Sequence, residues 1–374
     1  MGDTMTDPQG PVLRVAVVGA GNISGAYLTT FSRLANLRVT AIADLDPDRA
    51  AAAAAGVAGA RAATPQELYA ADDVDLVLNL TIPAVHAQVA HAAIAAGKHV
   101  YGEKPLAATT AEARALLEAA DRAGVRVGCA PDTVLGTGVQ TARAVLDSGE
   151  IGVPVAASAF MVTPGHEHWH PAPEFYYQPG GGPLLDMGPY YLTALITLLG
   201  PVRRVVGMSS TPRATRTVGS GPRAGTQFPV EVATHVTGVL EHADGALSTL
   251  IMSFDVWAGV LPHIEVYGTG GSLSVPDPNG FDGEVRLFRA GAKEWEPVPE
   301  RGGYPGASRG YGVADLARAL AEDAPHRADG RLAYHVLDVM ESLLAAARTG
   351  ESLSVASTCD RPAAVPAGAR PEHH

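Results

Sequence analysis

The stretch Val12–Ser24, which reads VLRVAVVGAGNIS, decides the fold of the first part of this chain. Its beginning, Val12–Gly19, is an apolar run of the kind that is buried on both faces of a parallel sheet. Gly21 completes a glycine-rich turn, and a helix is predicted from about Asn22 to Ala35. A strand, a glycine turn and a helix in this order predict the first unit of a doubly wound α/β domain.

Short strands and helices keep alternating as far as Pro131. Two helix starts carry clear signals, Asp46-Pro47 as an N-cap with proline at the first helical position, and Thr64–Glu67 as a capping box. Repeated β–α units with short links predict a parallel sheet with right-handed crossovers. The further strands are predicted at residues 37–44, 75–81, 99–103 and 125–129.

Beyond about residue 150 the pattern changes to strands in which polar and apolar residues alternate. Few helices separate these strands, so they predict a largely antiparallel sheet, one face of which needs a cover. Helices predicted at 311–322 and 331–347 pack against that sheet or against the first domain. The strands are predicted at residues 154–161, 203–210, 231–241, 246–256, 261–268 and 284–289.

The expected fold class is α/β, with an N-terminal Rossmann-type parallel sheet and a C-terminal α+β domain on a large, mostly antiparallel open sheet. The first domain is expected to span residues 12–131 and the second residues 132–360, with mobile ends at 1–11 and 361–374. A length of 374 residues agrees with two to three domains at about 150 residues each.

Composition excludes several classes of protein. The chain is 47% hydrophobic and 18% charged, which rules out intrinsic disorder and allows a sizeable core. A net charge of −12 argues against nucleic acid or anionic membrane surfaces as partners. Cys129 and Cys359 lie too far apart for a disulfide framework or a metal-ligand spacing, and Cys129 is expected to be a buried thiol. With no targeting or membrane-spanning segment in view, the expected location is the cytoplasm.

The glycine turn has the features of a dinucleotide site. Gly19 allows the tight turn, and Gly21 lets the backbone approach a pyrophosphate that rests on the helix N-terminus. Asp44, at the end of the second strand, can accept hydrogen bonds from both ribose hydroxyls and would repel a 2′-phosphate. The site is therefore expected to bind NAD in preference to NADP. The residues expected to contact it here are Gly19, Gly21, Asn22, Ile23 and Asp44.

Two further motifs follow the fourth and fifth strands at the carboxyl edge of the sheet, where ligands of such sheets bind. Thr81, Pro83 and His86 follow the fourth strand, and Glu103 and Lys104 follow the fifth. We expect all five to line the cofactor site.

The sequence carries GAGNIS at residues 19–24, Asp44, TIPAVH at 81–86, EKP at 103–105 and GGGPLLDMGPYY at 180–191. Together these stretches resemble the Gfo/Idh/MocA family, which includes glucose–fructose oxidoreductase, inositol dehydrogenases and many sugar and polyol dehydrogenases. The resemblance runs from about residue 14 to about residue 362. EKP at this place with a distal Asp-x-Gly is its most specific part.

The resemblance implies roles by position. Lys104 matches the lysine that lies between the nicotinamide and the reacting hydroxyl, which it orients or makes more acidic. Glu103 matches the residue near the nicotinamide ribose, and Lys104-Pro105 matches a peptide bond that is commonly cis. Asp186 matches a substrate-binding aspartate. The second domain is then the substrate-binding and oligomerisation domain.

The sequence departs from the family at Tyr190, where most members carry a histidine that transfers the proton. Some sugar ketoreductases of the family are held to use a tyrosine there, and Lys104 would lower the pKa of a neighbouring phenol. The alternative is that Tyr190 only hydrogen-bonds the substrate while Lys104 or water carries the proton, and Tyr191 is the second choice for the role. Lys104, Asp186 and Tyr190 are the expected catalytic residues.

The segment His166–His170, HEHWH, has histidines at a spacing that metal sites on strands use. No further ligand cluster is evident, so we expect no metal. We expect this loop to form a wall of the substrate pocket, with Trp169 stacked on a sugar ring and His170 bonded to its hydroxyls. The alternative is a solvated surface loop, which is also the expectation for Arg213–Gly225.

The sequence and the resemblance together predict an NAD-dependent dehydrogenase or ketoreductase acting on a sugar, glycoside or polyol. One alternative is a redox-neutral enzyme that cleaves glycosides through a 3-keto intermediate. Another is a non-catalytic sensor that binds the dinucleotide. The expected partners are a small carbohydrate or polyol substrate and further copies of the chain, in a homodimer or homotetramer formed through the open sheet.

Overall fold

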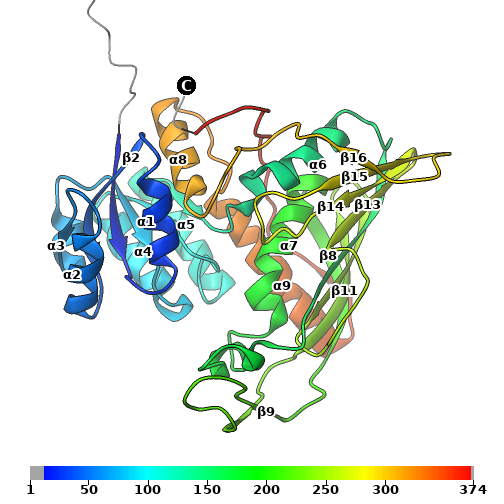
Figure 1. Ribbon diagram of the computed structural model, residues 1–374, viewed down its shortest axis with the longest axis horizontal. Helices are drawn as coiled ribbons and strands as arrows, with labels where there is room; N and C mark the ends of the chain where they lie inside the picture. Colours follow the sequence, from blue (N-terminus) through cyan, green and yellow to red (C-terminus); the bar gives the residue numbers. More distant parts are fainter. Residues whose placement is uncertain (1–11, 372–374) are drawn as a thin grey trace, which may run out of the picture. The chain divides into compact units, whose positions relative to one another are not determined.

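The computed structural model describes residues 12–371, so the N-terminal segment 1–11 that was expected to be mobile lies outside the described residues. The chain folds into two compact units. Among the described residues, the first unit holds 12–132, 308–330 and 369–371, and the second holds 133–307 and 331–368. Figure 1 traces the chain by colour from the N-terminal to the C-terminal end.

The first unit is built on a parallel six-stranded sheet in the order β3-β2-β1-β4-β5-β6. This is the doubly wound topology that the alternating sequence predicts. The strands are β1 (Leu13–Val18), β2 (Leu37–Ala43), β3 (Arg61–Ala62), β4 (Leu76–Asn79), β5 (His99–Gly102) and β6 (Val127–Cys129). The helices are α1 (Ser24–Phe31), α2 (Pro47–Ala55), α3 (Pro65–Ala70), η1 (Pro83–Val85), α4 (His86–Ala95), α5 (Thr110–Ala123) and α8 (Tyr311–Ala321).

The helix starts follow the signals of the sequence. The Asp46 side chain accepts hydrogen bonds from two backbone N–H groups of the first turn of α2. Thr64 and Glu67 form the predicted capping box of α3. The predicted helix 22–35 is shorter at both ends, since α1 covers only Ser24–Phe31.

Helix α8 belongs to the first unit, although the sequence placed it in a second domain of residues 132–360. Val313 and Leu316 of α8 pack with Tyr27 and Phe31 of α1 in the core that covers one face of the parallel sheet. The N-terminus of α8 is held by Asp132, whose Oδ2 accepts hydrogen bonds from the backbone N–H groups of residues 310 and 312 at 2.8 and 2.9 Å. Periodicity revealed the helix but not the sheet on which it packs.

The second unit is built on a nine-stranded sheet in the order β16-β15-β14-β13-β7-β12-β11-β8-β17. All the neighbouring pairs are antiparallel except β7 and β12. The strands are β7 (Pro154–Val162), β8 (Val202–Ser210), β11 (His235–His242), β12 (Leu247–Ser253), β13 (Ile264–Gly268), β14 (Gly271–Val275), β15 (Val285–Arg289), β16 (Glu296–Val298) and β17 (Leu353–Ser354). A separate pair is formed by β9 (Thr215–Thr217) and β10 (Gln227–Pro229).

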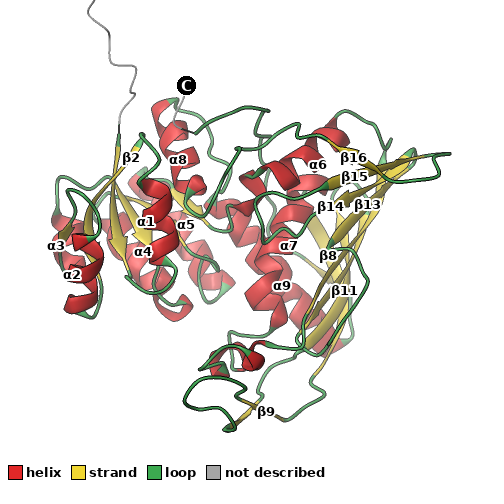
Figure 2. Ribbon diagram, in the orientation of Figure 1, coloured by secondary structure: helices red, strands yellow, loops and turns green. Residues whose placement is uncertain are grey.

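Helices cover one face of this sheet (Figure 2). They are α6 (Thr137–Asp147), α7 (Pro183–Leu199) and nearly all of α9 (Gly330–Thr349), with 3-10 turns η2 (Thr133–Leu135), η3 (His166–His168) and η4 (Glu174–Tyr177). The expectation that few helices separate the strands missed α7. Pro183 at its first position and Gly200 directly after its end were its signals.

The C-terminal residues 361–371 are packed, which corrects the expectation of a mobile end. Val365 is 1% exposed, and its N–H donates to Gln140 Oε1 at 2.8 Å. Arg361 donates to the Thr197 carbonyl at 2.8 Å and pairs with Asp147 at 2.9 Å. Local polarity suggested a loose tail because these partners lie far away in the sequence. None of the described helices has the length and apolar character that crossing a membrane requires.

Candidate active site

The glycine turn between β1 and α1 has the geometry that a dinucleotide requires. Gly19 has φ +102°, and a Cβ atom there would lie 2.7 Å from the Leu80 carbonyl oxygen, so only glycine fits. A Cβ atom at Gly21 would meet nothing within 4 Å, which leaves the backbone open to a ligand. Asn22 and Ile23 complete the turn, and the α1 N-terminus has no side-chain cap. Its free N–H groups suit an anion.

Asp44 lies just after β2 and faces this turn. Its Oδ2 accepts the Ala20 N–H at 2.8 Å, and its Oδ1 accepts the Asp46 N–H at 2.9 Å. Burial alone would raise the pKa of the Asp44 carboxyl, but the Asp46 and Ala20 N–H groups and the nearby Arg49 together hold it below its ordinary value. An ionised carboxylate has about four acceptor positions, so Asp44 retains capacity for ribose hydroxyls.

Two exposed apolar residues at this edge were missed by the sequence analysis. Leu45 follows Asp44 and is 98% exposed, and Ile82 follows Thr81 and is 68% exposed. Both come directly after residues that the sequence assigned to the cofactor. An exposed apolar side chain beside a strand end was the signal that marked them.

The segment after β4 is held by the buried side chains of Asn79 and His86. Asn79 Oδ1 accepts the Thr81 hydroxyl at 2.6 Å, and Asn79 Nδ2 donates to the His86 carbonyl at 3.0 Å. His86 is 2% exposed, with Nδ1 2.7 Å from the Pro105 carbonyl and Nε2 2.9 Å from the Thr81 carbonyl. We interpret His86 as a residue that positions these two loops, because both ring nitrogens already face backbone oxygens. Pro83 begins η1 and fixes the turn between them.

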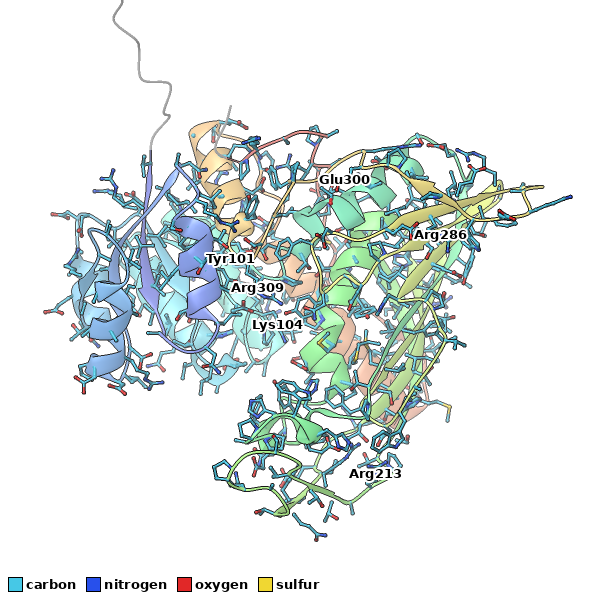
Figure 3. All side chains as sticks on the ribbon, in the orientation of Figure 1. Tyr101, Lys104, Arg213, Arg286, Glu300 and Arg309 are labelled. Carbon is cyan, nitrogen blue, oxygen red and sulfur yellow. The ribbon has the colours of Figure 1, made fainter. Side chains whose placement is uncertain are left out.

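Glu103 and Lys104 follow β5 at the same edge, and Figure 3 labels Lys104 beyond the end of that strand. Glu103 Oε1 accepts the Tyr27 hydroxyl at 2.8 Å, and its Oε2 accepts the Lys104 N–H at 3.1 Å. The Lys104–Pro105 peptide bond is cis, as the resemblance implied. The EKP motif is thus fixed through Tyr27 to α1, the helix that follows the glycine turn.

Two buried groups lie near this edge without the character of reactants. Cys129 is 3% exposed, and burial raises the pKa of its thiol, so the prediction of a buried thiol is confirmed. Asp132 is 0% exposed, and burial raises the pKa of its carboxyl to about 6 although two backbone N–H groups oppose the shift. Its second oxygen, Oδ1, has no hydrogen-bond partner.

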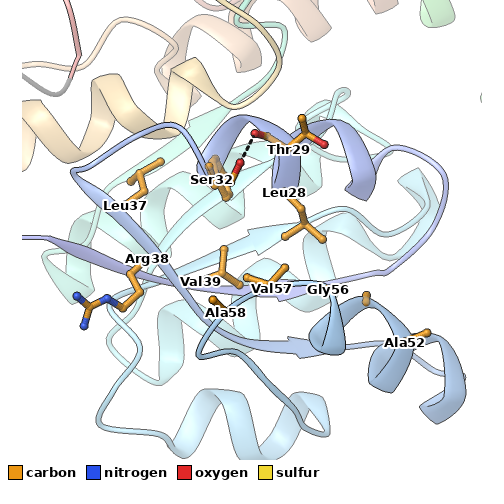
Figure 4. Close-up of a pocket in the computed structure, with 12 residues that line it drawn as sticks. Leu28, Thr29, Ser32, Leu37, Arg38, Val39, Ala52, Gly56, Val57 and Ala58 are labelled. Atoms are coloured by element: carbon orange, nitrogen blue, oxygen red, sulfur yellow. Dashed lines mark hydrogen bonds between the residues drawn. The ribbon is translucent and has the colours of Figure 1, made fainter.

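A groove of about 690 Å³ opens between α1, β2 and α2 (Figure 4). Leu28, Leu37, Val39 and Val57 make its lining largely apolar. It lies at the start of β2, at the opposite end of the strand from Asp44. Ligands of doubly wound sheets bind at the carboxyl ends of the strands, so this groove is not the cofactor site.

In the second unit, Asp186 lies in the first turn of α7. Gly182, with φ +91°, precedes Pro183 and lets the chain turn sharply into the helix, and its carbonyl accepts the Asp186 N–H at 3.0 Å. The Asp186 Oδ2 lies 2.9 Å from Nε2 of His166, and the side chains are 16% and 13% exposed. His166 was not among the predicted site residues, although its place in the HEHWH pattern marked it.

Aromatic rings surround His166 and continue to the surface. The centroid of its ring lies 4.3 Å from Tyr176 and 5.3 Å from Trp169. His170 packs on Trp169 at 5.4 Å and on Phe175 at 5.4 Å. Trp169 is 59% exposed and Phe175 is 53% exposed, so the outer end of this aromatic surface is open to solvent.

Arg216 anchors this loop from below, which corrects the expectation that Arg213–Gly225 is a solvated segment. Its side chain is 1% exposed, and Nη1 lies 2.6 Å from Glu167 Oε1. Nη2 lies 2.5 Å from Asp255 Oδ1, and Tyr177 donates its hydroxyl to Glu167. Burying three charges is tolerable only because they neutralise one another. The partners are distant in sequence, so composition alone could not reveal the network.

The two tyrosines of α7 differ. Tyr190 is 5% exposed and follows Asp186 by four residues, which puts both on one face of the helix. The Tyr191 hydroxyl is instead 3.1 Å from His263 Nδ1 and donates to Asp277 Oδ1 at 3.3 Å. Burial and the nearby Asp277 raise the pKa of the Tyr191 phenol, so it is a poor substitute for Tyr190 as an acid. Among the described residues, no group of three or more His, Cys, Asp or Glu side chains is arranged to hold a metal ion.

An open glycine turn, a helix N-terminus and an acid at the end of the second strand together define a dinucleotide-binding protein. Comparison with known sequences identifies the class further. The model of the oxidoreductase family with an NAD-binding Rossmann fold matches residues 13–130, and that of the GFO/IDH/MocA C-terminal domain matches residues 139–274. The chain belongs to the Gfo/Idh/MocA family of NAD-dependent oxidoreductases.

Two relatives align with most of the chain. The 1,5-anhydro-D-fructose reductase of Ensifer adhaerens is 28% identical over 334 residues, which are 82% of this chain and 94% of that protein. The dTDP-3,4-didehydro-2,6-dideoxy-alpha-D-glucose 3-reductase of Streptomyces violaceoruber is 32% identical over 326 residues, 83% of this chain and 92% of that protein.

Solved structures share the fold. An NAD binding oxidoreductase from Klebsiella pneumoniae has a TM-score of 0.80 at 24% identity, covering 92% of this chain and 99% of that one. Levoglucosan dehydrogenase in complex with NADH and levoglucosan has a TM-score of 0.78 at 22% identity, covering 92% of this chain and 100% of that one. At these identities the likeness establishes the architecture.

Proposed function

We propose that this protein transfers a hydride between NAD and a secondary alcohol or ketone carbon of a sugar, glycoside or polyol. The observation that carries the proposal is the second unit's pairing of Asp186 with an aromatic surface that ends in exposed rings. A carboxylate for hydroxyl groups beside rings for C–H faces is the combination that carbohydrates require. The two relatives that align with most of the chain are both named as reductases of sugar derivatives.

The residues divide the work by their chemistry. Bound NAD supplies the hydride acceptor in oxidation and, when reduced, the donor. Lys104 is proposed to orient and polarise the reacting hydroxyl or carbonyl with its ammonium group, while Glu103 fixes the backbone of the EKP turn. Asp186 binds sugar hydroxyls, and Tyr190, one turn further along α7, contacts the reacting oxygen. Trp169 and His170 are proposed to hold the face and outer hydroxyls of the sugar.

The cofactor contacts are proposed for Gly19, Gly21, Asn22 and Ile23 on the pyrophosphate side and Asp44 on the ribose. Thr81, Pro83 and Glu103 line the same edge, and His86 acts by positioning it. Arg49, the cation nearest to Asp44, lies 3.3 Å from it and 3.2 Å from Asp46. With these two carboxylates beside it, Arg49 is a poor receptor for a 2′-phosphate, which supports NAD over NADP.

The test incubates the protein with NAD and a panel of free sugars, polyols and p-nitrophenyl glycosides, and follows NADH and p-nitrophenolate together. NADH growth that disappears in Lys104→Met, while NADH still binds, is the expected result. Release of p-nitrophenolate without net NADH would assign the redox-neutral cleavage instead. Tight NADH binding without turnover of any sugar, in either direction, would favour a sensor.

We also propose that the protein forms a homodimer or homotetramer through the uncovered face of the large sheet. Val206 and Met208 of β8 and Val239 of β11 lie on that face, at 43%, 74% and 37% exposure. Helices cover the opposite face, so a second copy is the occupant that a flat sheet face of this size suits. Light scattering should give a multiple of the 38.5 kDa chain mass, and Met208→Glu with Val239→Glu should reduce it to one.

A further inference from the structure

We infer that His166, oriented by Asp186, is the group that exchanges the proton with the reacting hydroxyl. The inference rests on the proposed function and goes beyond it, because it assigns proton transfer to a residue outside the EKP and Asp-x-Gly motifs. It is drawn from the geometry of the second unit alone.

The hydrogen-bond chemistry of the pair fixes the state of the imidazole. His166 Nε2 lies 2.9 Å from Asp186 Oδ2. An ionised carboxylate only accepts hydrogen bonds, so Nε2 carries the proton of the neutral ring. The lone pair is then on Nδ1, which makes no hydrogen bond with any residue in the described part of the chain. An imidazole held on one nitrogen by a carboxylate and bare on the other is the arrangement of a general base.

The ring is held in one orientation by its neighbours. Phe254 and Tyr176 pack on it with centroids at 4.5 and 4.3 Å. The backbone N–H of His166 donates to the Tyr177 hydroxyl at 3.2 Å, and that hydroxyl is bonded to Glu167. A base fixed in this way loses little entropy when it meets a substrate.

The titratable side chains that face His166 are few. Asp186 on α7 bonds to the ring, and Tyr176 on η4 packs against it. Glu167 lies beneath the loop, neutralised by Arg216, whose second partner is Asp255. Asp186 is therefore the charged group that bonds directly to the imidazole.

The neighbouring histidines are arranged differently. His170 Nδ1 accepts the Ala172 N–H at 3.1 Å, so its lone pair is already used in the backbone. His168 Nε2 lies 3.7 Å from Glu167 Oε1, and its side chain is 41% exposed on the far side of the loop's ion pair. His168 thus supplies a matched control, in the same loop and of the same residue type.

The proposed step balances as follows. In oxidation, the substrate carbon gives up a hydride to NAD, the hydroxyl gives up its proton to the lone pair of His166 Nδ1, and the carbon–oxygen bond becomes a carbonyl. His166 becomes an imidazolium beside the Asp186 carboxylate and then releases the proton to water. Reduction runs through the same states in reverse, with the imidazolium as the acid.

The kinetic test compares His166→Gln and His166→Asn with His168→Gln. Both His166 variants should turn over at least about 100-fold more slowly than the wild type at saturating substrate, and should lose the acidic limb of the pH–rate profile. His168→Gln should keep the turnover rate and the pH profile of the wild type. Unchanged NADH affinity and thermal midpoint in the His166 variants show that they fold. A wild-type turnover rate and pH profile in both His166 variants would overturn the inference while the proposed function stands.

A second readout does not depend on turnover. In protein with ¹⁵N-labelled histidine at a pH where the ring is neutral, His166 should show a protonated Nε2 and a bare Nδ1, and binding of a substrate sugar should shift Nδ1. A bare Nε2 would refute the assignment. If Tyr190→Phe abolished turnover and the His166 variants did not, the proton would belong to the tyrosine. If the wild type turned over no sugar, the proposed function would fail, and a sugar that still shifts Nδ1 would keep His166 as a binding group only.

Discussion

Asp132→Asn should make this protein more stable at neutral pH, although it alters a fully buried helix cap. The wild-type carboxyl accepts the N–H groups at the start of α8 through Oδ2, while Oδ1 has no partner. Asparagine keeps one acceptor oxygen for those N–H groups and carries no charge. The substitution therefore removes the cost of burying an ion and retains the cap.

The size of the effect follows from the pKa of this carboxyl, which burial raises from 3.8 to about 6. Below pH 3.8 the group is protonated in both states, so its contribution to stability is complete there. Between about pH 4 and about pH 6 the unfolded chain loses the proton first, and the folded state becomes less stable as pH rises. A difference of about 2 pKa units corresponds to about 3 kcal/mol, lost by about pH 7.

The assay is urea denaturation of wild type and Asp132→Asn from pH 4 to 7.5, followed by circular dichroism. Other groups titrate in this range, so the quantity of interest is the difference between the two proteins at each pH. It should grow from near zero at pH 4 to about 3 kcal/mol in favour of the variant at pH 7. Asp132→Ala, which loses the cap as well, should gain less. A difference that is constant with pH, or that favours the wild type increasingly as pH rises, would refute the reasoning.

Three further predictions follow from single contacts. Gly19→Ala places a Cβ atom 2.7 Å from the Leu80 carbonyl oxygen at φ +102°, and should cost about 1–3 kcal/mol of stability and weaken NADH binding at least about tenfold in a fluorescence titration. Arg216→Met leaves Glu167 and Asp255 buried without their cation; it should cost about 3–5 kcal/mol and raise KM for the sugar, and an unchanged melting temperature would contradict the network. Trp169→Ala should change stability by less than about 0.5 kcal/mol, because the side chain is 59% exposed, yet raise KM for the sugar with little change in KM for NAD.

The first unit could be predicted closely because its signals are local. The apolar run at 12–19, the caps at Asp46 and Thr64 and the glycine turn each act within a few residues, and the parallel sheet follows from their order. Strand ends moved by one or two residues, since pairing partners rather than propensity decide where a ladder stops. Helix α8 was found as a helix but assigned to the wrong unit, because amphipathicity says that a face is buried and not against what.

The second unit was predicted less well, and α7 shows why. Its stretch 183–199 is apolar on nearly every side, so it lacks the periodic polar face by which a surface helix is recognised. Buried helices and buried strands look alike in such a run, and the surrounding strands favoured the wrong interpretation. The missed helix carries Asp186 and Tyr190, so the position of the substrate residues had to come from the resemblance instead.

The HEHWH loop shows that the character of a site can be hidden in its support. Histidines at alternate positions suggested either a metal or a solvated surface, and the structure shows a third arrangement. Arg216 lies about fifty residues away in the chain, and it neutralises Glu167 so that the loop can be buried on its inner side. With that side anchored, His166 turns toward Asp186 and Trp169 stays exposed. The polar residues of this loop therefore have different tasks: Glu167 holds it in place, and His166 is left to meet a substrate.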